Sequence, residues 1–437
     1  MSQLFKNFLG DQRGNIAVIF GIAILPILSL VGAAVDYSQV AQIRTKLQAA
    51  SDAASVGAVS KNSPAFLAAG SMTSDGSIAL GGPDAINLFN GNIVGKTGFT
   101  LNKVDAVVSK AGSAVTSTVT YSANIATSFL AVAGIKTIAI SGQSTASASM
   151  PLYIDFYLLL DNSPSMGVGA TPSDVTTMVN NTPDSCAFAC HDLNDSNNYY
   201  KLAKSLGVTT RIDVLRSATQ QLMDTAGSIA TYPSQFRMAI YDFGGSAQSA
   251  GLRSLFSLSS SLSSAKSAAG NIDLMTVNGQ NDNNDQDTAF STLLPAVNNA
   301  IGAPGAGTSS APLKYLFFVS DGVADEANGG CLKPKSGTAR CQSPINPALC
   351  KTLKDRGIKV AVLYTTYLSL PTNNWYNTWI APFNVGPYGP SLNSEIATNM
   401  QTCASPGFYF EVSPSQGISD AMNTLFRKAV ADAHISS

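Results

Sequence analysis

The first sixty residues carry two hydrophobic patterns in succession. Residues 16–35, IAVIFGIAILPILSLVGAAV, form an apolar run without a charge, long enough to span the roughly 30 Å hydrocarbon core of a bilayer. Beyond this run, apolar residues recur at steps of three and four up to about Ser60, which is the spacing of one helix face: Val40, Ile43, Leu47, Ala50 and Ala54. The pattern predicts a transmembrane helix that continues as an amphipathic helix, packed against a partner helix or against its own domain.

Residues 60–149 change to a pattern of turns and strand-like runs. Residues 99–108 and 114–121 alternate with a period of two, and a third, Ser/Thr-rich strand runs from Thr137 to about Ser149. Residues 126–132 resemble a short helix between them. We expect an antiparallel sheet packed on the long helix, which gives a small α+β domain without catalytic chemistry.

From Pro151 onward, apolar strands alternate with amphipathic helices, the pattern of βα units and a mostly parallel sheet. Several strands are continuously apolar, as expected when helices cover both faces. The predicted strands are 153–160, 236–243, 315–320, 358–364 and 408–412, and the predicted helices are 211–228, 288–301, 347–356, 392–402 and 418–430. The predicted fold class is therefore α/β, preceded by a transmembrane helix and a small α+β domain.

These patterns give the expected domain organisation. It consists of a cytoplasmic tail at 1–15, the transmembrane helix at 16–35, a stalk domain at 36–150 and an α/β domain at 151–437, in which 167–210 and 244–287 are long inserted loops.

Charge is sparse in this chain. Charged residues make up 12% of the sequence and the net charge is -1, which argues against an electrostatic nucleic-acid binder. Lys6 and Arg13 precede the apolar run and Asp36 follows it, so the positive-inside rule favours a cytoplasmic N-terminus and an exported remainder. Arg44 and Lys46 on the far side weaken this argument.

Candidate chemistry gathers where two buried strands end. Asp161, Ser163 and Ser165 follow the strand 153–160, where open α/β sheets place their sites. All three offer oxygen, the ligand that a hard cation such as Mg²⁺ prefers. The alternative is a helix cap made by the same residues. Asp321 follows a second buried strand in the same way.

All six cysteines lie after residue 185. An even number on the exported side of a membrane anchor indicates disulfides, and the spacing favours Cys186–Cys190, Cys331–Cys341 and Cys350–Cys403. The alternative for the first pair is a metal site that also uses His191.

The N-terminal segment resembles a known family. RGNIAVIF, the exit Val35-Asp36-Tyr37 and LQAASDAA are similar to the TadE/TadG-like proteins of the Flp (Tad) pilus system. The resemblance implies a protein anchored in the inner membrane through residues 16–35, with its bulk periplasmic or surface-exposed, and with pilus or pseudopilin components as partners. Pilins of this system are cut after a Gly that precedes a Glu by five residues, but Ile19 stands five residues after Gly14. Processing by a prepilin peptidase is therefore not favoured.

The C-terminal domain resembles a von Willebrand factor A domain. Asp161-x-Ser163-x-Ser165, then Thr288 at an expected helix start, then Asp321-Gly322 after a strand, match the order of its metal-ion-dependent adhesion site. The resemblance implies a Rossmann-like sheet and Mg²⁺, or Mn²⁺ or Ca²⁺, held directly by Ser163, Ser165 and Thr288. Asp161 and Asp321 would act mostly through water, and an open position would accept an acidic group from a partner.

Three functions are compatible with these residues. The favoured one is a non-enzymatic binding protein that works in pilus assembly, anchoring or adhesion. A purely structural envelope protein with a vestigial metal site is the second. A serine hydrolase using Ser163 or Ser165 is the third, but the chain lacks the G-x-S-x-G sequence of that class.

Overall fold

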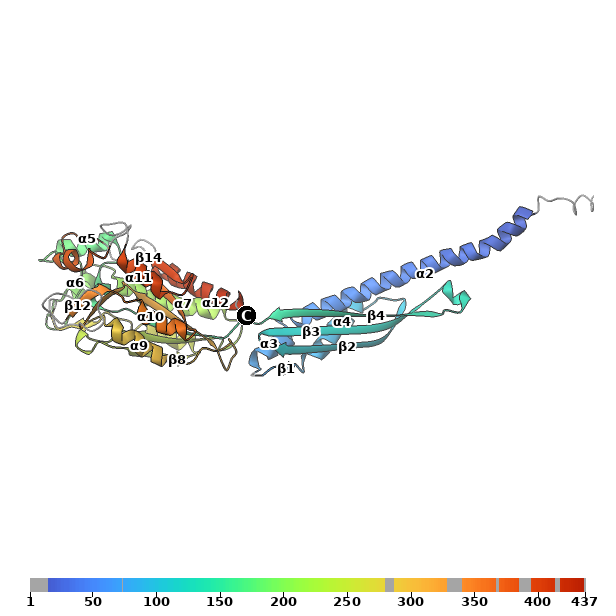
Figure 1. The fold of residues 1–437 in the computed structure, drawn as a ribbon, viewed down its shortest axis with the longest axis horizontal. Coiled ribbons are helices and arrows are strands. Elements are labelled where there is room, and N and C mark those ends of the chain that lie inside the picture. The colour runs from blue at the N-terminus through green and yellow to red at the C-terminus, as the bar shows by residue number, and fades with distance from the viewer. Residues whose placement is uncertain are drawn as a thin grey trace, which may run out of the picture. The chain divides into compact units, whose positions relative to one another are not determined.

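The chain forms two compact units, Met1–Met150 and Pro151–Ser437, and Figure 1 labels many of their helices and strands. The computed structural model describes residues 15–72, 74–279, 287–327, 340–366, 369–384, 394–412 and 417–435. The predicted cytoplasmic tail, apart from its last residue, lies outside the described residues. Each unit is described by itself.

The first unit begins with one helix, α2 (Asn15–Ala58). Its N-terminal part is exposed, and it is long and apolar enough to cross a membrane. The predicted stripe is buried along the rest of the helix, with Leu47 and Ala54 at 0% exposure. The helix packs on β3 and β4 of the same unit, so the stripe serves the domain's own core.

An antiparallel sheet covers one side of α2, as predicted. Its strand order is β1-β2-β3-β4, and β3 pairs with both β2 and β4 over its whole length. The strand bounds are β1 Gly76–Ser77, β2 Phe99–Ala111, β3 Ala114–Ala126 and β4 Thr137–Ser149. The helix expected at 126–132 is only a 3₁₀ turn at Leu130–Ala133. Two helices were not predicted, α3 (Pro64–Ser71) and α4 (Gly81–Ile93).

The second unit is built on a six-stranded sheet in the order β14-β13-β10-β5-β7-β8. Five strands are parallel and only β8, at the edge, is antiparallel. The bounds are β5 Ile154–Leu160, β7 Phe236–Asp242, β8 Arg253–Ser259, β10 Leu313–Ser320, β13 Lys359–Thr365 and β14 Tyr409–Val412. The five predicted strands and the Rossmann-like order of the sheet are confirmed.

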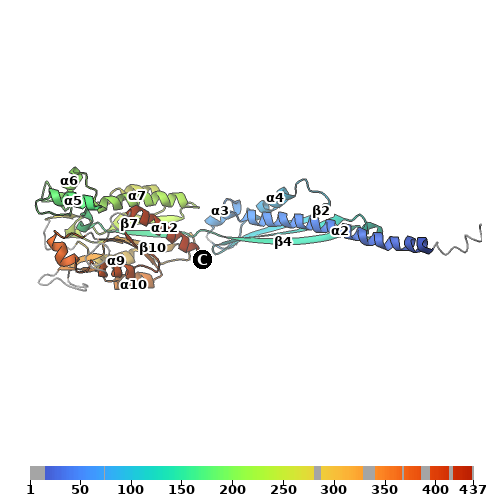
Figure 2. The same ribbon diagram turned by 90° about the horizontal axis from the view of Figure 1, so that it is seen from above.

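Helices cover both faces of this sheet, and Figure 2 shows α7 on one side of the strands and α9 and α10 on the other. Alternate residues of β5 point to the two layers, with Phe156 and Leu158 in one core and Tyr157 and Leu159 in the other. One layer holds α7 (Arg211–Ile229), α8 (Leu262–Ala269) and α12 (Ile418–Ile435), and the other holds α9 (Phe290–Ala300), α10 (Ala348–Asp355) and α11 (Glu395–Cys403). Burial on both faces explains the continuously apolar strands.

The two long inserts are more ordered than predicted. The first contains α5 (Pro172–Asn181), β6 (His191–Asp192) and α6 (Tyr199–Ser205), and the second contains β8, α8 and β9 (Thr276–Val277). They also pair with each other, since His191 of β6 lies opposite Thr276 of β9. The helices and strands inside the inserts were not predicted; β8, for example, is a half-buried edge strand whose Ser-rich sequence shows no clean alternation.

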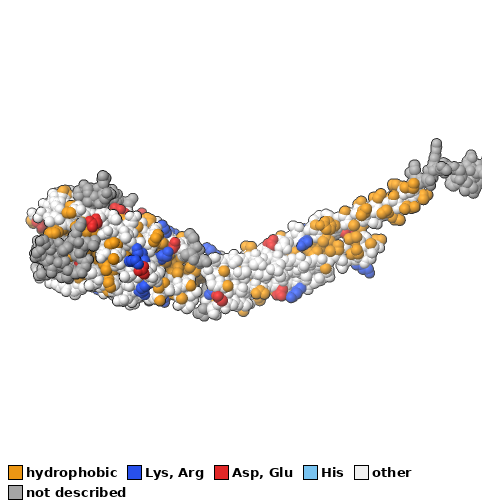
Figure 3. Space-filling view, in the orientation of Figure 1, with side chains coloured by type: hydrophobic (Ala, Val, Ile, Leu, Met, Phe, Trp, Pro, Cys, Tyr) orange, Lys and Arg blue, Asp and Glu red, His pale blue; other side chains and the backbone are white. Residues whose placement is uncertain are grey.

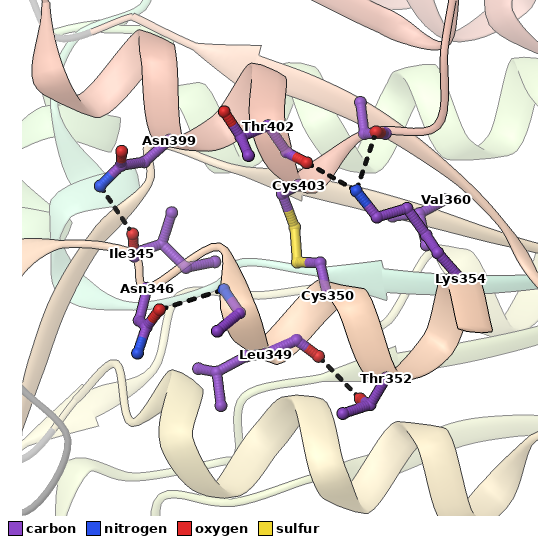
Figure 4. Close-up of a disulfide and its surroundings, with 12 residues drawn as sticks. Ile345, Asn346, Leu349, Cys350, Thr352, Lys354, Val360, Asn399, Thr402 and Cys403 are labelled. Atoms are coloured by element: carbon purple, nitrogen blue, oxygen red, sulfur yellow. Dashed lines mark hydrogen bonds between the residues drawn. A yellow bond between two sulfur atoms is a disulfide. The ribbon is translucent and has the colours of Figure 1, made fainter. Parts of the chain in front are cut away.

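One disulfide is formed among the described residues, between Cys350 and Cys403, as predicted. Figure 4 shows that it joins α10 to α11. Lys354 Nζ of α10 donates to the carbonyl oxygen of Thr402 at 2.6 Å, and Asn399 Nδ2 of α11 donates to that of Ile345 at 2.9 Å. The disulfide and the Lys354 hydrogen bond therefore join α10 to α11, and the Asn399 hydrogen bond joins α11 to the segment just before α10.

The predicted Cys186–Cys190 disulfide is not formed. Both residues are buried thiols, and the segment before β6 is extended, with Phe188 bridged to Val168. The prediction assumed a helical turn, which this segment does not make. In the Cys331–Cys341 pair, Cys331 lies outside the described residues.

A buried charge triad ties the three central strands together. Asp155 of β5 lies directly opposite Arg237 of β7 and Lys314 of β10. Arg237 Nε and Nη2 donate to the Asp155 carboxylate at 2.6 and 2.7 Å, and Lys314 donates to it as well. The Asp155 side chain is 0% exposed and that of Lys314 is 8% exposed. The Asp155 and Lys314 charges therefore depend on their partners for solvation, whereas Arg237 also reaches solvent.

We predict that Asp155→Ala in the 151–437 unit lowers the free energy of unfolding by about 3–5 kcal/mol, because it leaves the buried Lys314 ammonium uncompensated. Urea unfolding measures this loss. The control is Asp224→Ala, which removes an exposed ion pair with Lys266 and should cost less than about 1 kcal/mol. Equal losses for the two variants would contradict the prediction.

Candidate metal centre

The candidate site lies where the strand order of the second unit reverses. From β5 the chain first builds β7 and β8 on one side, and then crosses to β10, β13 and β14 on the other. Leu160 of β5 pairs with Val319 of β10, so Asp161 and Asp321 both leave the sheet at the carboxyl edge of neighbouring strands. This switch point is where open α/β sheets bind their ligands.

Asp161 is held by hydrogen bonds at both carboxylate oxygens. Its carboxylate is fully buried and accepts hydrogen bonds from Ser163 N at 2.9 Å and Ser163 Oγ at 2.5 Å, both at Oδ1. The other oxygen, Oδ2, accepts from Ser320 Oγ at 2.5 Å. Asp161 N donates to Val319 O at 2.9 Å, which extends the pairing of β5 and β10 into the site.

The loop after Asp161 curls tightly, as predicted. A 3₁₀ turn at Pro164–Gly167 follows Ser163, and Met166 N donates to Ser163 O at 2.9 Å. As a result, Ser163 Oγ and Ser165 Oγ are 3.0 Å apart. The alternative reading of a helix cap is not supported for Ser163, because its side chain makes no capping hydrogen bond to this turn.

Asp321 and Thr288 complete the predicted set. Asp321 is fully buried and is followed by Gly322 at a φ of +75°, a conformation that glycine adopts without strain. A side chain at Gly322 would also meet Met400 at 2.7 Å. Thr288 is 4% exposed, and its backbone exchanges two hydrogen bonds with Asp325, at 3.1 and 3.0 Å. The helix expected to open at Thr288 begins at Phe290, so Thr288 lies in a bridge to the segment that follows Asp321.

Two further residues organise the site, and the sequence pattern did not reveal them. Asn162, fully buried, donates through Nδ2 to Gly244 O at 2.8 Å and to Asp273 O at 3.1 Å. Its Oδ1 accepts from Phe243 N at 3.1 Å, so one side chain joins three loops. Ser320 holds the second carboxylate oxygen of Asp161. Ser320 is the last residue of β10 and directly precedes Asp321, and this position in the sequence could have indicated that it belongs to the site.

The electrostatics of Asp161 differ from those of the other buried carboxylates. Burial, and then the negative charge of Asp321, raise the pKa of Asp161 to about 7, while hydrogen bonds from Ser163 and Ser320 lower it. Asp242, at the end of β7, is also buried, but Arg253 Nε donates to it at 2.9 Å. Burial raises the pKa of Asp242, and the guanidinium of Arg253 opposes that shift. The charged neighbour of Asp161 is thus a second carboxylate, that of Asp321, whereas the charged neighbour of Asp242 is the Arg253 cation.

The donor set fits a hard divalent cation. Two buried carboxylates and the hydroxyls beside them offer only oxygen, which suits Mg²⁺, Mn²⁺ or Ca²⁺. The two carboxylates leave neighbouring paired strands side by side, and a cation would offset their like charges. Among the residues that the structure describes, no group of three or more His, Cys, Asp or Glu could hold a metal. The alternative metal site of Cys186, Cys190 and His191 is therefore not found among these residues.

The N-terminal segment matches a known family. Residues 14–61 match the family model described as Flp pilus-assembly TadE/G-like, which confirms the resemblance of the N-terminal segment. No curated protein sequence matches this chain.

Solved structures similar to the chain include pilus and matrix proteins. The von Willebrand factor domain of the type V pili tip protein Mfa5 from Porphyromonas gingivalis is 9% identical, with a TM-score of 0.36, over 65% of this chain and 97% of that one. A structure of three N-terminal domains of the same protein is 8% identical, with a TM-score of 0.34, over 74% of this chain and 55% of that one. Proximal thread matrix protein 1 from the mussel byssus is 12% identical, with a TM-score of 0.30, over 64% of this chain and 46% of that one. Because these TM-scores are low, the fold is assigned from the strand order of the sheet and not from these similarities.

The raised pKa of Asp161 predicts a pH dependence of stability. The folded pKa of about 7 exceeds the ordinary value of 3.8, so the folded state retains a proton that the unfolded state has lost. The free energy of unfolding of the metal-free 151–437 unit should therefore fall as the pH rises from about 4 to about 7. Urea unfolding across this range measures the fall.

Asp161→Asn is the matched control for this prediction. It keeps the shape of the side chain, removes the titrating group and ends the repulsion with Asp321. Its stability should lack this component of the pH dependence and should exceed that of the native unit above about pH 7. The same slope in both proteins would show that Asp161 does not titrate in this range.

Proposed function

We propose that this chain is a membrane-anchored, exported binding protein of the Flp/Tad pilus type, which engages acidic groups on protein partners through a bound divalent cation. Its work would be in pilus assembly, pilus anchoring or adhesion. The observation that carries the proposal is the buried Asp161–Asp321 pair, set among hydroxyls at the switch point of the sheet.

The N-terminal part of the chain supports the membrane and pilus portion of this proposal. Residues 14–61 match a pilus-assembly family, and α2 is apolar enough to cross a membrane. The Cys350–Cys403 disulfide favours an oxidising compartment, such as the periplasm or the cell surface. Partners would therefore be pilus or pseudopilin components, met outside the cytoplasm.

The residues of the site have defined parts in this proposal. Ser163, Ser165 and Thr288 would hold Mg²⁺ through their hydroxyls, with Asp161 and Asp321 behind them. Mg²⁺ keeps several waters and needs few protein ligands. When bound, the ion supplies a positive charge for a partner's carboxylate.

The geometry explains why an acidic group would be chosen. Ser163 Oγ already donates to Asp161, so the hydroxyl oxygen is oriented while the carboxylate stays fully buried. Neutral hydroxyl ligands leave most of the charge of the ion uncompensated, so a further anion is attracted. Asn162 keeps the loop in place by its hydrogen bonds to the neighbouring loops.

Two alternatives make different predictions. In a structural protein with a vestigial site, a protonated Asp161 would suffice to satisfy Ser163 and Ser320, and no metal would be needed. The usual serine hydrolase has a histidine base beside its nucleophile, whereas the acceptor of the Ser163 hydroxyl is the Asp161 carboxylate. His191 packs on Tyr200 and lies 3.4 Å from Leu274 O, which gives it no part in this site.

We predict that Mg²⁺ raises the melting temperature of the 151–437 unit and that Asp161→Asn abolishes this effect. A ligand at about 100 times its Kd stabilises a protein by about 2.7 kcal/mol, which a thermal melt detects readily. The variant Asp224→Ala, in an exposed ion pair, should respond to Mg²⁺ as the native unit does.

Partner binding is tested on the full chain, with envelope extracts passed over it in Mg²⁺ or in chelator. Native protein should retain partners only in Mg²⁺, and Asp161→Asn should retain none. A melting temperature that does not respond to Mg²⁺, Mn²⁺ or Ca²⁺ would support the structural alternative instead.

A further inference from the structure

The connection between β3 and β4 is fixed to α2 by a buried carboxylate. Asp36, 1% exposed, accepts hydrogen bonds from the backbone N–H groups of Ser128, Phe129 and Leu130 at 3.0, 2.9 and 2.7 Å. These three donors stand at the start of the 3₁₀ turn Leu130–Ala133. The connection, residues 127–136, is therefore attached to α2 at the position of Asp36.

That position coincides with the end of the predicted membrane span. A Cβ placed on Gly32 would lie 2.5 Å from Cβ of Phe129, so only glycine lets the connection approach α2 this closely. Gly32 precedes Val35, the last residue of the apolar run, by three positions. At about 1.5 Å per residue, Phe129 contacts the helix about 4–5 Å inside the expected end of the span.

The connection is also unusually apolar on its surface. The exposed fractions are 53% for Phe129, 91% for Val132 and 49% for Ile135. Isolated exposed apolar residues are ordinary, but these three stand within seven positions of one short connection. Figure 3 shows hydrophobic side chains continuing from the exposed part of α2 onto the adjoining end of this unit.

Most backbone N–H groups of the connection are hydrogen-bonded within the first unit. Besides the three groups bonded to Asp36, the N–H groups of Thr127, Val132, Gly134 and Ile135 donate to carbonyl oxygens within the connection, at 3.0–3.1 Å. An unsatisfied polar group is costly in a lipid environment. These hydrogen bonds lower the cost of moving the segment out of water.

We infer that residues 127–136 form a second membrane contact, which inserts Phe129, Val132 and Ile135 into the lipid interface on the non-cytoplasmic side. The occupant of this surface is lipid because the patch is continuous with the membrane-crossing helix and is held at its boundary. The exposed Lys136 beside it suits an anionic headgroup. Two contacts would restrict the tilt and rotation of the first unit on the membrane. The inference rests on the membrane anchor of the proposed function, and it is independent of the metal site.

The test uses the full chain reconstituted into vesicles of phosphatidylcholine and phosphatidylglycerol, with or without bromine on the acyl chains. Val132→Trp places a probe on the connection, and Val107→Trp is the matched control. Val107 is 57% exposed and pairs with Thr118, eight residues from the end of β3, or about 27 Å. Emission is read as the difference from the native chain, whose tryptophans are Trp375 and Trp379.

Brominated lipid should reduce the added emission of Val132→Trp about twofold, as expected for an aromatic side chain at the interface, and should leave Val107→Trp unchanged. Adding Gly32→Val, which displaces Phe129 but keeps the helix apolar, should abolish the quenching at position 132. Flotation of the vesicles shows separately that α2 anchors each variant.

Three results would overturn the inference. The first is equal quenching at positions 132 and 107 in chains that float with the vesicles. The second is quenching at 132 that survives Gly32→Val. The third is a tryptophan at 132 that is shielded from aqueous iodide but untouched by brominated lipid, because a protein partner or a second copy would then cover the patch.

Discussion

The parallel pairing of β5 with β10 is the constraint on which the chemistry of the second unit depends. It places Leu160 opposite Val319, so that Asp161 and Asp321 leave the sheet side by side. A slip of one residue would turn every side chain of β5 to the other face, and the two cores, which the strand fills from both sides, forbid it. The precision of the site therefore comes from packing far from the site itself.

Three buried aspartates of this unit show how the environment of a charge separates structure from function. Asp155 is compensated by Arg237 and Lys314, and Asp242 by Arg253. These ion pairs are complete within the chain and belong to the framework. Asp161 instead has hydroxyl donors and the charge of Asp321, and its burial beside that charge holds its pKa far above the ordinary value. Such a group is stabilised either by a proton or by a cation, and this competition underlies the proposed role of the site.

The first unit uses a buried carboxylate in a different way. Asp36 follows the apolar run directly, at a place where an acidic residue would also serve as a simple stop to the membrane span. Its three backbone hydrogen bonds give it a second role, since they fix the β3–β4 connection to the helix. Gly32, one turn earlier, provides the space for Phe129. The end of the apolar run of α2 and the end of the sheet are thus built as one structure.

The sequence by itself determined the features that depend on local periodicity or on the way an element ends. These are the long apolar run, the buried stripe of α2, the five parallel strands and the two aspartates at strand ends, because such signals lie within a few residues of each other. The Cys350–Cys403 disulfide was also predicted, although from spacing and by elimination. Only the tertiary structure decided the edge strand β8, the pairing of the two inserts, the state of Cys186 and Cys190, and the roles of Asn162, Ser320 and Asp36. The physical reason is that each of these depends on contacts between segments distant in the chain, and a residue such as Asn162 looks like a spacer until three loops meet around it.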